Sequence, residues 1–298
     1  MTHTRRDFAL MAAGVAASTP SFAQTPKIEA PKGPWTEEGA VQRGGTRIHY
    51  VGMGSGPPLI LLHKLGGWVA DWRHVAPALA QKYRVIAMDM PGHGDSTING
   101  PTPFLQTLGE NAAVIMAALD ELKIDKFDVV GNSHGGCTAV VMAALWPERV
   151  KHLVLLSVAL GGVTSREALE KVVDPPGYYD ANGVPQTRPF EEIQKSFGVE
   201  SRSVYEEQNA SRAKGGAWVR ASLRGVGNGG VANYLPRITA PTLLIYGERG
   251  TYHSYEKVGK EKLKRVRSVF IPNTGSFTHQ ENPRETEKVL LSFLAEPT

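Results

Sequence analysis

The stretch Phe127-Asp128-Val129-Val130-Gly131-Asn132-Ser133-His134-Gly135-Gly136 decides the predicted fold. Its first four residues form a run of strand length, and a helical run opens at Gly136. Between the two lies the pattern Gly-x-Ser-x-Gly, which holds Ser133 on a sharp turn where the flanking positions have no room for side chains. We therefore expect the Ser133 hydroxyl to be exposed at the end of a buried strand. The His134 amide is expected to point from the start of the helix toward whatever Ser133 attacks.

Runs of strand length alternate with helical stretches along most of the chain. The strand runs are Arg47–Val51, Leu59–Leu62, Val85–Met88, Phe127–Val130, His152–Leu156, Leu243–Tyr246 and Ser268–Ile271, and helical periodicity marks Leu105–Leu122, Cys137–Trp146 and Pro283–Leu294. This order predicts an α/β fold with a mostly parallel sheet and helices on both faces. A polar segment at about residues 161–235 interrupts the alternation, and we interpret it as an inserted, mainly helical cap.

The first 23 residues have the pattern of a twin-arginine signal peptide. Arg5-Arg6 precedes a short apolar run, and Ser21-Phe22-Ala23 provides small residues for cleavage before Gln24. The apolar run is far shorter than the roughly 20 residues that a bilayer crossing needs, so we expect no stable membrane anchor after cleavage. The predicted destination is the periplasm. Residues 24–40 are interpreted as a tether and residues 41–298 as the folded domain.

Composition restricts the kinds of chemistry that are available. The chain has 298 residues, 41% of them hydrophobic, a net charge of +4 and a single cysteine, so an intramolecular disulfide is impossible. We find no metal-ligand spacing, no glycine-rich phosphate loop and no basic-aromatic stripe typical of nucleic-acid binding. We therefore expect a small-molecule substrate, with no cofactor, no metal and no nucleic acid. The oligomeric state is left open.

Several ordered motifs between about Thr46 and Leu294 resemble those of the α/β-hydrolase family. They are Leu61-Leu62-His63 with Gly66-Gly67, the run from Asp89 to Ser96, the Ser133 turn, the run from Pro241 to Glu248, and Glu281-Asn282-Pro283. The resemblance is to capped esterases and, through Asn132, to carbon–carbon bond hydrolases. It implies that Ser133 is the nucleophile, that a late histidine is the base, and that an acid orients this histidine. It also implies an oxyanion site formed by the amides of Leu65 and His134.

The sequence departs from the family pattern at the catalytic positions, so the triad is degenerate. Gly250 stands where the family has its acid, and Ser276 stands where the family has its base. In some relatives the acid comes from the strand that follows the helix after Ser133. Here that strand ends without a carboxylate. Lys64 replaces a residue of the oxyanion loop that is usually glycine.

Three hypotheses follow from these departures. In the first, the protein is a serine hydrolase of a small carboxylic ester or related carbonyl compound, with His279 as base and Glu248 as a possible acid. In the second, the Lys64 amine deprotonates Ser133, as in Ser-Lys enzymes. In the third, a degenerate hydrolase binds a small ligand without turnover, because a serine without a base is a poor nucleophile.

Two further side chains are candidates for substrate contact. Trp68 follows the oxyanion loop, and Arg220 lies in the cap, where an arginine can hold a substrate carboxylate. The alternatives are a core position for Trp68 and a solvated helix face for Arg220. For the His134 side chain, a satisfied structural role is the alternative to a catalytic one.

Overall fold

A computed structural model describes residues 28–298 of the chain. The predicted signal peptide lies outside this range and stays a prediction. Within residues 28–298, nine strands form one sheet in the order β1-β2-β4-β3-β6-β7-β8-β9, with β5 pairing with β2. The strands are β1 (Glu37–Arg43), β2 (Thr46–Met53), β3 (Pro58–Leu62), β4 (Arg84–Met88), β5 (Thr97–Ile98), β6 (Phe127–Asn132), β7 (Val150–Leu156), β8 (Thr242–Gly247) and β9 (Val266–Ile271).

The sheet is parallel in its centre and antiparallel at one edge. Neighbouring strands from β4 through β3, β6, β7, β8 and β9 all pair in parallel, whereas β2 pairs antiparallel with β1, β4 and β5. The predicted strand Arg47–Val51 lies within β2, but the prediction that it runs parallel was wrong. The proposed tether at residues 24–40 also needs correction, because Glu37 to Ala40 already pair with β2.

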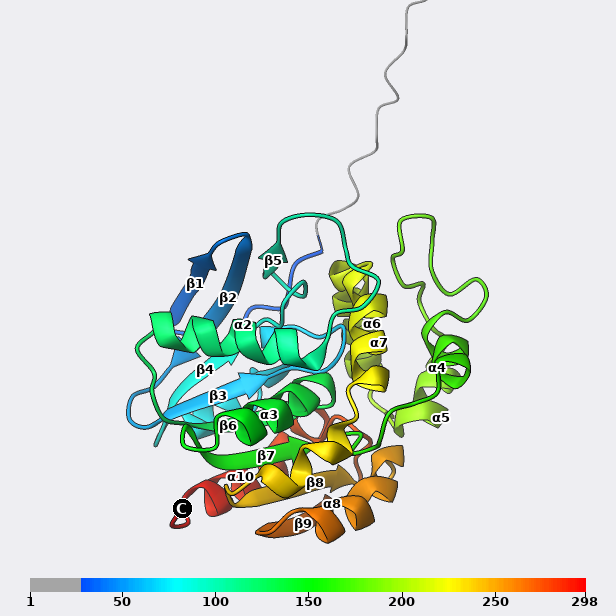
Figure 1. The fold of residues 1–298 in the computed structure, drawn as a ribbon. Coiled ribbons are helices and arrows are strands. Elements are labelled where there is room, and N and C mark those ends of the chain that lie inside the picture. The colour runs from blue at the N-terminus through cyan, green and yellow to red at the C-terminus, as the bar shows by residue number, and fades with distance from the viewer. Residues whose placement is uncertain (1–27) are drawn as a thin grey trace, which may run out of the picture.

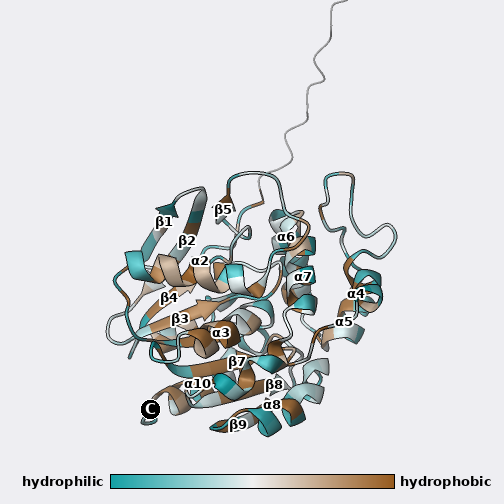
Figure 2. Ribbon diagram, viewed as in Figure 1, coloured by the Kyte–Doolittle hydropathy of each residue, from teal (hydrophilic) through white to brown (hydrophobic). Residues whose placement is uncertain are grey.

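Apolar side chains alternate between the two faces of the sheet and bury both. In β3, Ile60 and Leu62 belong to a core shared with α2 (Leu108–Glu121) and α3 (His134–Leu145). Leu59 and Leu61 face the opposite core, which contains residues of α1 (Ala76–Leu79) and α10 (Pro283–Leu294). Figure 2 shows this as brown strands and a brown α3. The α/β fold with helices on both faces is confirmed.

The segment between β7 and β8 forms the predicted cap. It contains α4 (Arg166–Val173), α5 (Phe190–Phe197), α6 (Arg202–Gly215) and α7 (Trp218–Asn228), followed by the short 3₁₀ helices η2 (Val231–Asn233) and η3 (Leu235–Arg237). In Figure 1 the four α-helices stand together on one side, beyond the arrowhead of β3. Ligands of parallel α/β sheets bind at the carboxyl ends of the strands, so the cap covers the edge where a site is expected.

The remaining elements are short. They are the 3₁₀ helices η1 (Val69–Trp72) and η4 (Thr251–Tyr255), and the α-helices α8 (Glu256–Lys262) and α9 (Thr278–Glu281). Within residues 28–298, no helix has the length and apolar character needed to cross a membrane.

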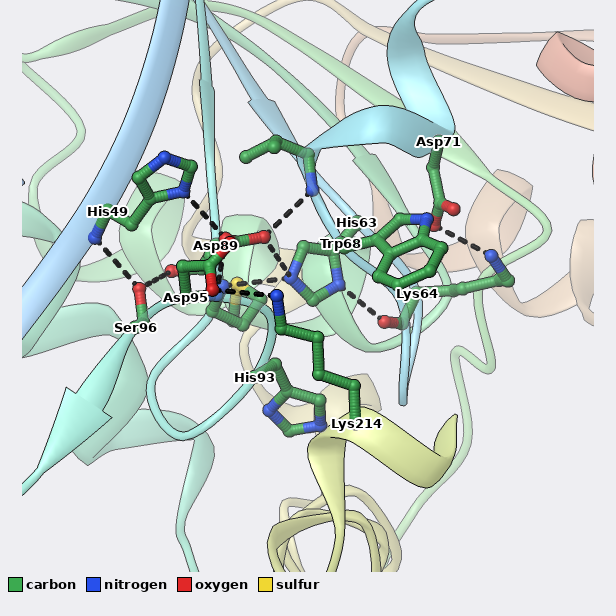
Figure 3. Close-up of polar contacts among 12 residues, drawn as sticks. His49, His63, Lys64, Trp68, Asp71, Asp89, His93, Asp95, Ser96 and Lys214 are labelled. Carbon is green, nitrogen blue, oxygen red and sulfur yellow. Dashed lines mark hydrogen bonds and ion pairs between the residues drawn. The ribbon is translucent and has the colours of Figure 1, made fainter. Parts of the chain in front are cut away.

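Asp89 organises the loop after β4 from a buried position, as Figure 3 shows. Its carboxylate accepts hydrogen bonds from the backbone amides of Val69 and Asp95, both at 2.8 Å, and lies 2.8 Å from His49 Nδ1. Burial opposes the charged form of His49, but the contacts to Asp89 prevail and raise the pKa of His49. Both Asp89 oxygens are thus occupied by donors, which indicates a structural role for this residue.

Replacement of Asp89 by asparagine should destabilise the fold by about 3 kcal/mol, because an amide NH₂ would then face buried N–H donors. The measurement is the free energy of unfolding in urea. Asp95→Asn is the matched control, since the Asp95 side chain is half exposed and its ion pair with Lys214 should contribute at most about 1 kcal/mol. Equal losses in the two variants would contradict the assignment of Asp89 as the organising group.

Candidate active site

Ser133 lies on a strained turn at the carboxyl end of β6. Its backbone has φ 49° and ψ −111°, a conformation that residues with a side chain rarely adopt. The turn is held by close packing, since a Cβ at Gly135 would lie 2.3 Å from the Leu62 carbonyl oxygen. The Ser133 amide donates to the Leu156 carbonyl at 3.0 Å, and the Ser133 carbonyl accepts from Cys137 at 2.8 Å. The serine is therefore fixed between two parallel strands and the first turn of α3.

A cavity of about 260 Å³ opens above Ser133 and runs under the cap. Its walls come from the sheet edge, from the cap and from the loops after β8 and β9. The polar lining side chains are Lys64, Ser133, Cys137, Ser157, Tyr178, Arg188, Glu192, Gln208, Arg212, Tyr252 and Ser276, and the others are Leu65, Ala159, Val172, Pro175, Phe197, Leu223, Val226 and Phe277. None of these residues is a histidine, so no imidazole from residues 28–298 lines this space.

The amides of Leu65 and His134 are available for an oxyanion. Nearby amides are occupied: Gly135 donates to the His63 carbonyl at 3.0 Å, and Gly67 donates to the Lys64 carbonyl at 2.9 Å. Neither the Leu65 nor the His134 amide donates to an acceptor within the described part of the chain. The His134 amide also stands at the positive end of the α3 dipole.

The His134 side chain does not line the cavity. It is buried, with Nε2 3.0 Å from the Asn111 amide nitrogen, and burial holds the pKa of His134 well below its usual range. This placement agrees with the structural alternative for the ring.

His63 supports the loop that carries the Leu65 amide. Its Nε2 accepts the Met90 amide at 2.9 Å, so the neutral ring carries its proton on Nδ1 and donates to the Lys64 carbonyl at 2.7 Å. Complete burial lowers the pKa of His63 to about 3, which keeps this tautomer neutral. The ring therefore supports the loop that carries the Leu65 amide.

Gly250 and Ser276 are neighbours in space. A Cβ built on Gly250 would lie 3.2 Å from Ser276 Oγ and 3.3 Å from the Ser276 amide. A carboxylate and an imidazole at these positions would thus face each other beside Ser133. The structure keeps the backbone positions for an acid and a base, while both functional side chains are missing. Ser276 Oγ is buried without a hydrogen-bond partner and lines the cavity.

His279 and Glu248 are not brought to Ser133. The His279 ring is fully buried and stacks on Trp72 with 4.4 Å between centroids, and neither ring nitrogen has a hydrogen-bond partner among the described residues. Burial, with Lys64 nearby, holds the pKa of His279 well below its usual range. The exposed Glu248 accepts from the Asn273 amide at 3.2 Å. This placement does not support His279 as base or Glu248 as its acid, because the loop that carries Ser276 turns His279 into the core.

Lys64 lines the cavity but is paired. Its Nζ donates to Asp71 Oδ2 at 2.7 Å (Figure 3). The same Nζ lies 5.0 Å from the centroid of the Phe277 ring. Both side chains are buried, at 2% and 0% exposure. Burial raises the pKa of Asp71, and the Lys64 ammonium opposes that rise. An ammonium has no lone pair, so Lys64 can accept the Ser133 proton only after it has lost a proton of its own.

The predicted substrate contacts, Trp68 and Arg220, lie elsewhere. The buried Trp68 donates from Nε1 to Glu207 at 3.1 Å, and Arg73 forms two 2.7 Å bonds to the same carboxylate. Trp68 therefore helps to attach α6 to the domain. Arg220 pairs with Asp174 at 3.1 Å and lines a different groove. Neither residue is among those that line the Ser133 cavity.

Sequence reasoning missed two functional candidates that line the cavity. Arg212 lies on α6, one turn after Gln208, and that i, i+4 spacing was the available signal. Tyr252 follows the glycine at the vacant acid position by two residues, but nothing in its sequence context distinguishes it. Both residues depend on the placement of their elements around Ser133.

The comparison with known families agrees with this geometry. A sequence model described as the alpha/beta hydrolase fold matches residues 57–283. The chain belongs to the α/β-hydrolase family.

The similar proteins have names that describe different activities. The chain is 28% identical over 276 residues to the 2-hydroxy-6-oxo-6-(2'-aminophenyl)hexa-2,4-dienoic acid hydrolase of Metapseudomonas resinovorans, covering 86% of this chain and 90% of that protein. It is 38% identical over 133 residues to a dihydrolipoyllysine-residue acetyltransferase component of an acetoin cleaving system from Pseudomonas putida. That match covers 44% of this chain and only 35% of the relative.

A solved structure is also similar. The crystal structure of a membrane phospholipase A, described as a bacterial virulence factor, has a TM-score of 0.70 and 30% sequence identity. The match covers 87% of this chain and 85% of the phospholipase chain. These relatives support the resemblance to hydrolases, including carbon–carbon bond hydrolases, and they name different substrates.

Replacing one partner of the Lys64–Asp71 pair should destabilise the protein strongly, whereas replacing both partners by apolar residues should change its stability little. We expect Lys64→Met and Asp71→Leu each to lower the free energy of unfolding by about 3–5 kcal/mol, and the double variant to lie near the unchanged protein. In Lys64→Met, the pKa of the buried Asp71 is raised above its unfolded value, so stability should recover as pH falls. Denaturation of all four proteins at neutral and acidic pH measures both effects, and additive losses in the double variant would contradict them.

Proposed function

We propose that this α/β-hydrolase family member is a serine hydrolase that acts on a small carboxylic ester or a related carbonyl compound. Ser133 attacks the carbonyl carbon, and the Leu65 and His134 amides hold the oxyanion. The observation that carries the proposal is the Ser133 backbone at φ 49°, which presents the hydroxyl to a cavity of about 260 Å³. Strained backbone conformations of this kind cluster at active sites, where the surrounding structure holds them in place.

The cavity favours a substrate with a negative charge. Arg212 is buried, and none of the carboxylates in residues 28–298 forms an ion pair with it. One Nη donates to the Tyr178 hydroxyl at 2.5 Å, while Nε is buried without a partner. Lys64 and Arg188, the other cations that line the cavity, are paired with Asp71 and Glu192. Arg212 therefore supplies an uncompensated positive charge, which a substrate carboxylate would neutralise.

The named relatives are consistent with this class of substrate. The Metapseudomonas enzyme is named for the hydrolysis of an oxo-dienoic acid, which contains both a carbonyl group and an acid group. A substrate that places its carbonyl on Ser133 and its carboxylate on Arg212 matches that pattern. The proposal for the present chain extends to carbonyl acids as a class.

The base remains a separate part of the proposal. Of the two bases that the sequence predicts, only Lys64 lines the cavity, and it must lose a proton to solvent before its amine can act. Ser-Lys catalysis by this route predicts a rate that climbs with pH, because the reactive form is the neutral amine.

A fluorophosphonate probe tests the nucleophile directly. The purified protein should be labelled, and Ser133→Ala should abolish labelling, because only an activated serine displaces fluoride at phosphorus. The measurement is the mass of the intact protein after incubation. Ser157→Ala removes another hydroxyl of the same cavity and should keep the label. Labelling that survives Ser133→Ala would contradict the assignment.

Arg212 should discriminate between charged and neutral substrates. We expect Arg212→Gln to raise KM for 4-nitrophenyl hemisuccinate by about 10- to 100-fold, the equivalent of a charge-assisted hydrogen bond of about 1.5–3 kcal/mol. KM for the neutral 4-nitrophenyl butyrate should change by less than about 3-fold. Arg220→Gln, outside the cavity, is the control and should change neither value. An equal rise in KM for both esters would contradict a carboxylate-binding site at Arg212.

One observation favours a second function, which is binding without turnover. Both residues at the acid and base positions are inert, Gly250 and Ser276, and no imidazole among the described residues lines the cavity. Absence of any labelling, together with calorimetric binding of a small carboxylate that Arg212→Gln weakens, would support a binding protein.

A further inference from the structure

Tyr252 lies beside Ser133 in a position that the proposed function has not used. It is carried by η4, lines the same cavity as Ser133, and is close enough for the two side chains to interact. Its ring packs against the core that contains α3, with the Tyr255 ring 6.3 Å away. Packing therefore fixes the Tyr252 ring, and the Tyr252 hydroxyl lies near the Ser133 hydroxyl that is proposed to react.

Tyr252 follows Gly250, one of the two positions at which the acid and base of the family are missing. Gly250 precedes η4 directly, and its neighbour Ser276 lines the cavity without a hydrogen-bond partner. No acid and no imidazole stand at these places, whereas the Tyr252 phenol lines the cavity and interacts with the Ser133 side chain. Tyr252 is therefore a candidate to carry the Ser133 proton.

We propose that Tyr252 is a catalytic residue that relays the Ser133 proton to the leaving group of the substrate. The inference rests on the proposed serine-hydrolase function and deepens it by naming the proton carrier. It requires neither His279 nor a neutral Lys64.

Acylation by this relay balances in atoms and charge. Ser133 Oγ bonds to the carbonyl carbon while its proton passes to the Tyr252 oxygen. The Tyr252 hydroxyl proton passes to the oxygen of the leaving alcohol, whose bond to the carbonyl carbon breaks. Deacylation reverses the order, since water attacks the acyl carbon, gives a proton to Tyr252, and Tyr252 returns its proton to Ser133 Oγ. Tyr252 is neutral before and after each step.

The surroundings of Tyr252 keep it protonated, as a relay needs. Burial is the largest cause that raises the pKa of Tyr252 to about 12, and Cys137 adds to the rise. The hydrogen bond to Ser133 and the charge of Arg212 act in the opposite direction. The pKa of Cys137 is itself raised to about 12 by burial, and His253, on the same 3₁₀ helix, is exposed and bonded to the Gly250 carbonyl. The relay therefore predicts a flat rate from about pH 7 to about pH 9.

The test compares Tyr252→Phe with the unchanged protein and with the control Tyr255→Phe, which removes the neighbouring hydroxyl outside the cavity. The readouts are the rate of fluorophosphonate labelling, the kinetics on 4-nitrophenyl butyrate and ethyl butyrate, the pH profile, and the thermal midpoint. Tyr252→Phe should slow labelling by about 10²- to 10⁴-fold with KM changed by less than about 3-fold. Tyr255→Phe should match the unchanged protein.

Leaving-group dependence separates a relay from mere positioning of Ser133. Ethoxide needs a proton to leave, whereas 4-nitrophenolate does not, so Tyr252→Phe should lower kcat/KM for ethyl butyrate at least about 10-fold more than for 4-nitrophenyl butyrate. Equal losses would overturn the relay, as would labelling within about 3-fold of the unchanged rate in a folded Tyr252→Phe. A rate that climbs from pH 7 to 9 and is lost in Lys64→Met would overturn it in favour of Lys64.

These outcomes also separate the relay from the function on which it rests. Labelling that depends on Ser133 but not on Tyr252 leaves a serine hydrolase without the relay. Failure of the unchanged protein to react with the probe overturns both.

Discussion

The backbone of Ser133 is the constraint on which the rest of the site depends. A residue with a side chain adopts φ 49° only when its surroundings leave no alternative. Here the parallel strands β3, β6 and β7 hold both sides of the turn, and Gly135 approaches the end of β3 too closely for a Cβ. The hydroxyl therefore stands at the positive end of α3, next to two free amides. Every proposal for the chemistry starts from that placement.

The loss of the usual acid and base is one coupled change in space. Gly250 and Ser276 are 26 residues apart in sequence, yet a Cβ on the first would touch the second. An imidazole without its acid, or an acid without its imidazole, cannot perform the usual catalysis. The absence of both is therefore consistent with one coupled change. The space that the pair would occupy is lined by Ser276 and Tyr252, and a phenol now contacts the nucleophile. Any chemistry at Ser133 has to be built from this different set of groups.

Buried charge shapes the cavity in two opposite ways. Lys64 and Asp71 neutralise each other at 2.7 Å, and Asp89 is satisfied by two amides and His49. Arg212 has no such carboxylate partner within residues 28–298, although it too is buried. Since an unpaired buried cation is unfavourable, a ligand with a negative group gains most by binding there. In the proposed function, the cap thus selects the charge of the substrate, and the sheet edge positions its reacting carbon.

The sequence by itself determined the α/β fold, the strand runs, the cap at about residues 161–235 and the turn at Ser133, because periodicity and glycine spacing are local properties. It also showed that the acid and base positions hold Gly250 and Ser276. Only the tertiary structure decided that β2 runs antiparallel, that His279 stacks in the core, that Trp68 attaches the cap, and that Arg212 rather than Arg220 lines the cavity with Tyr252. The physical reason is that these side chains meet Ser133, or miss it, through contacts between elements far apart in the chain. No local pattern records such contacts.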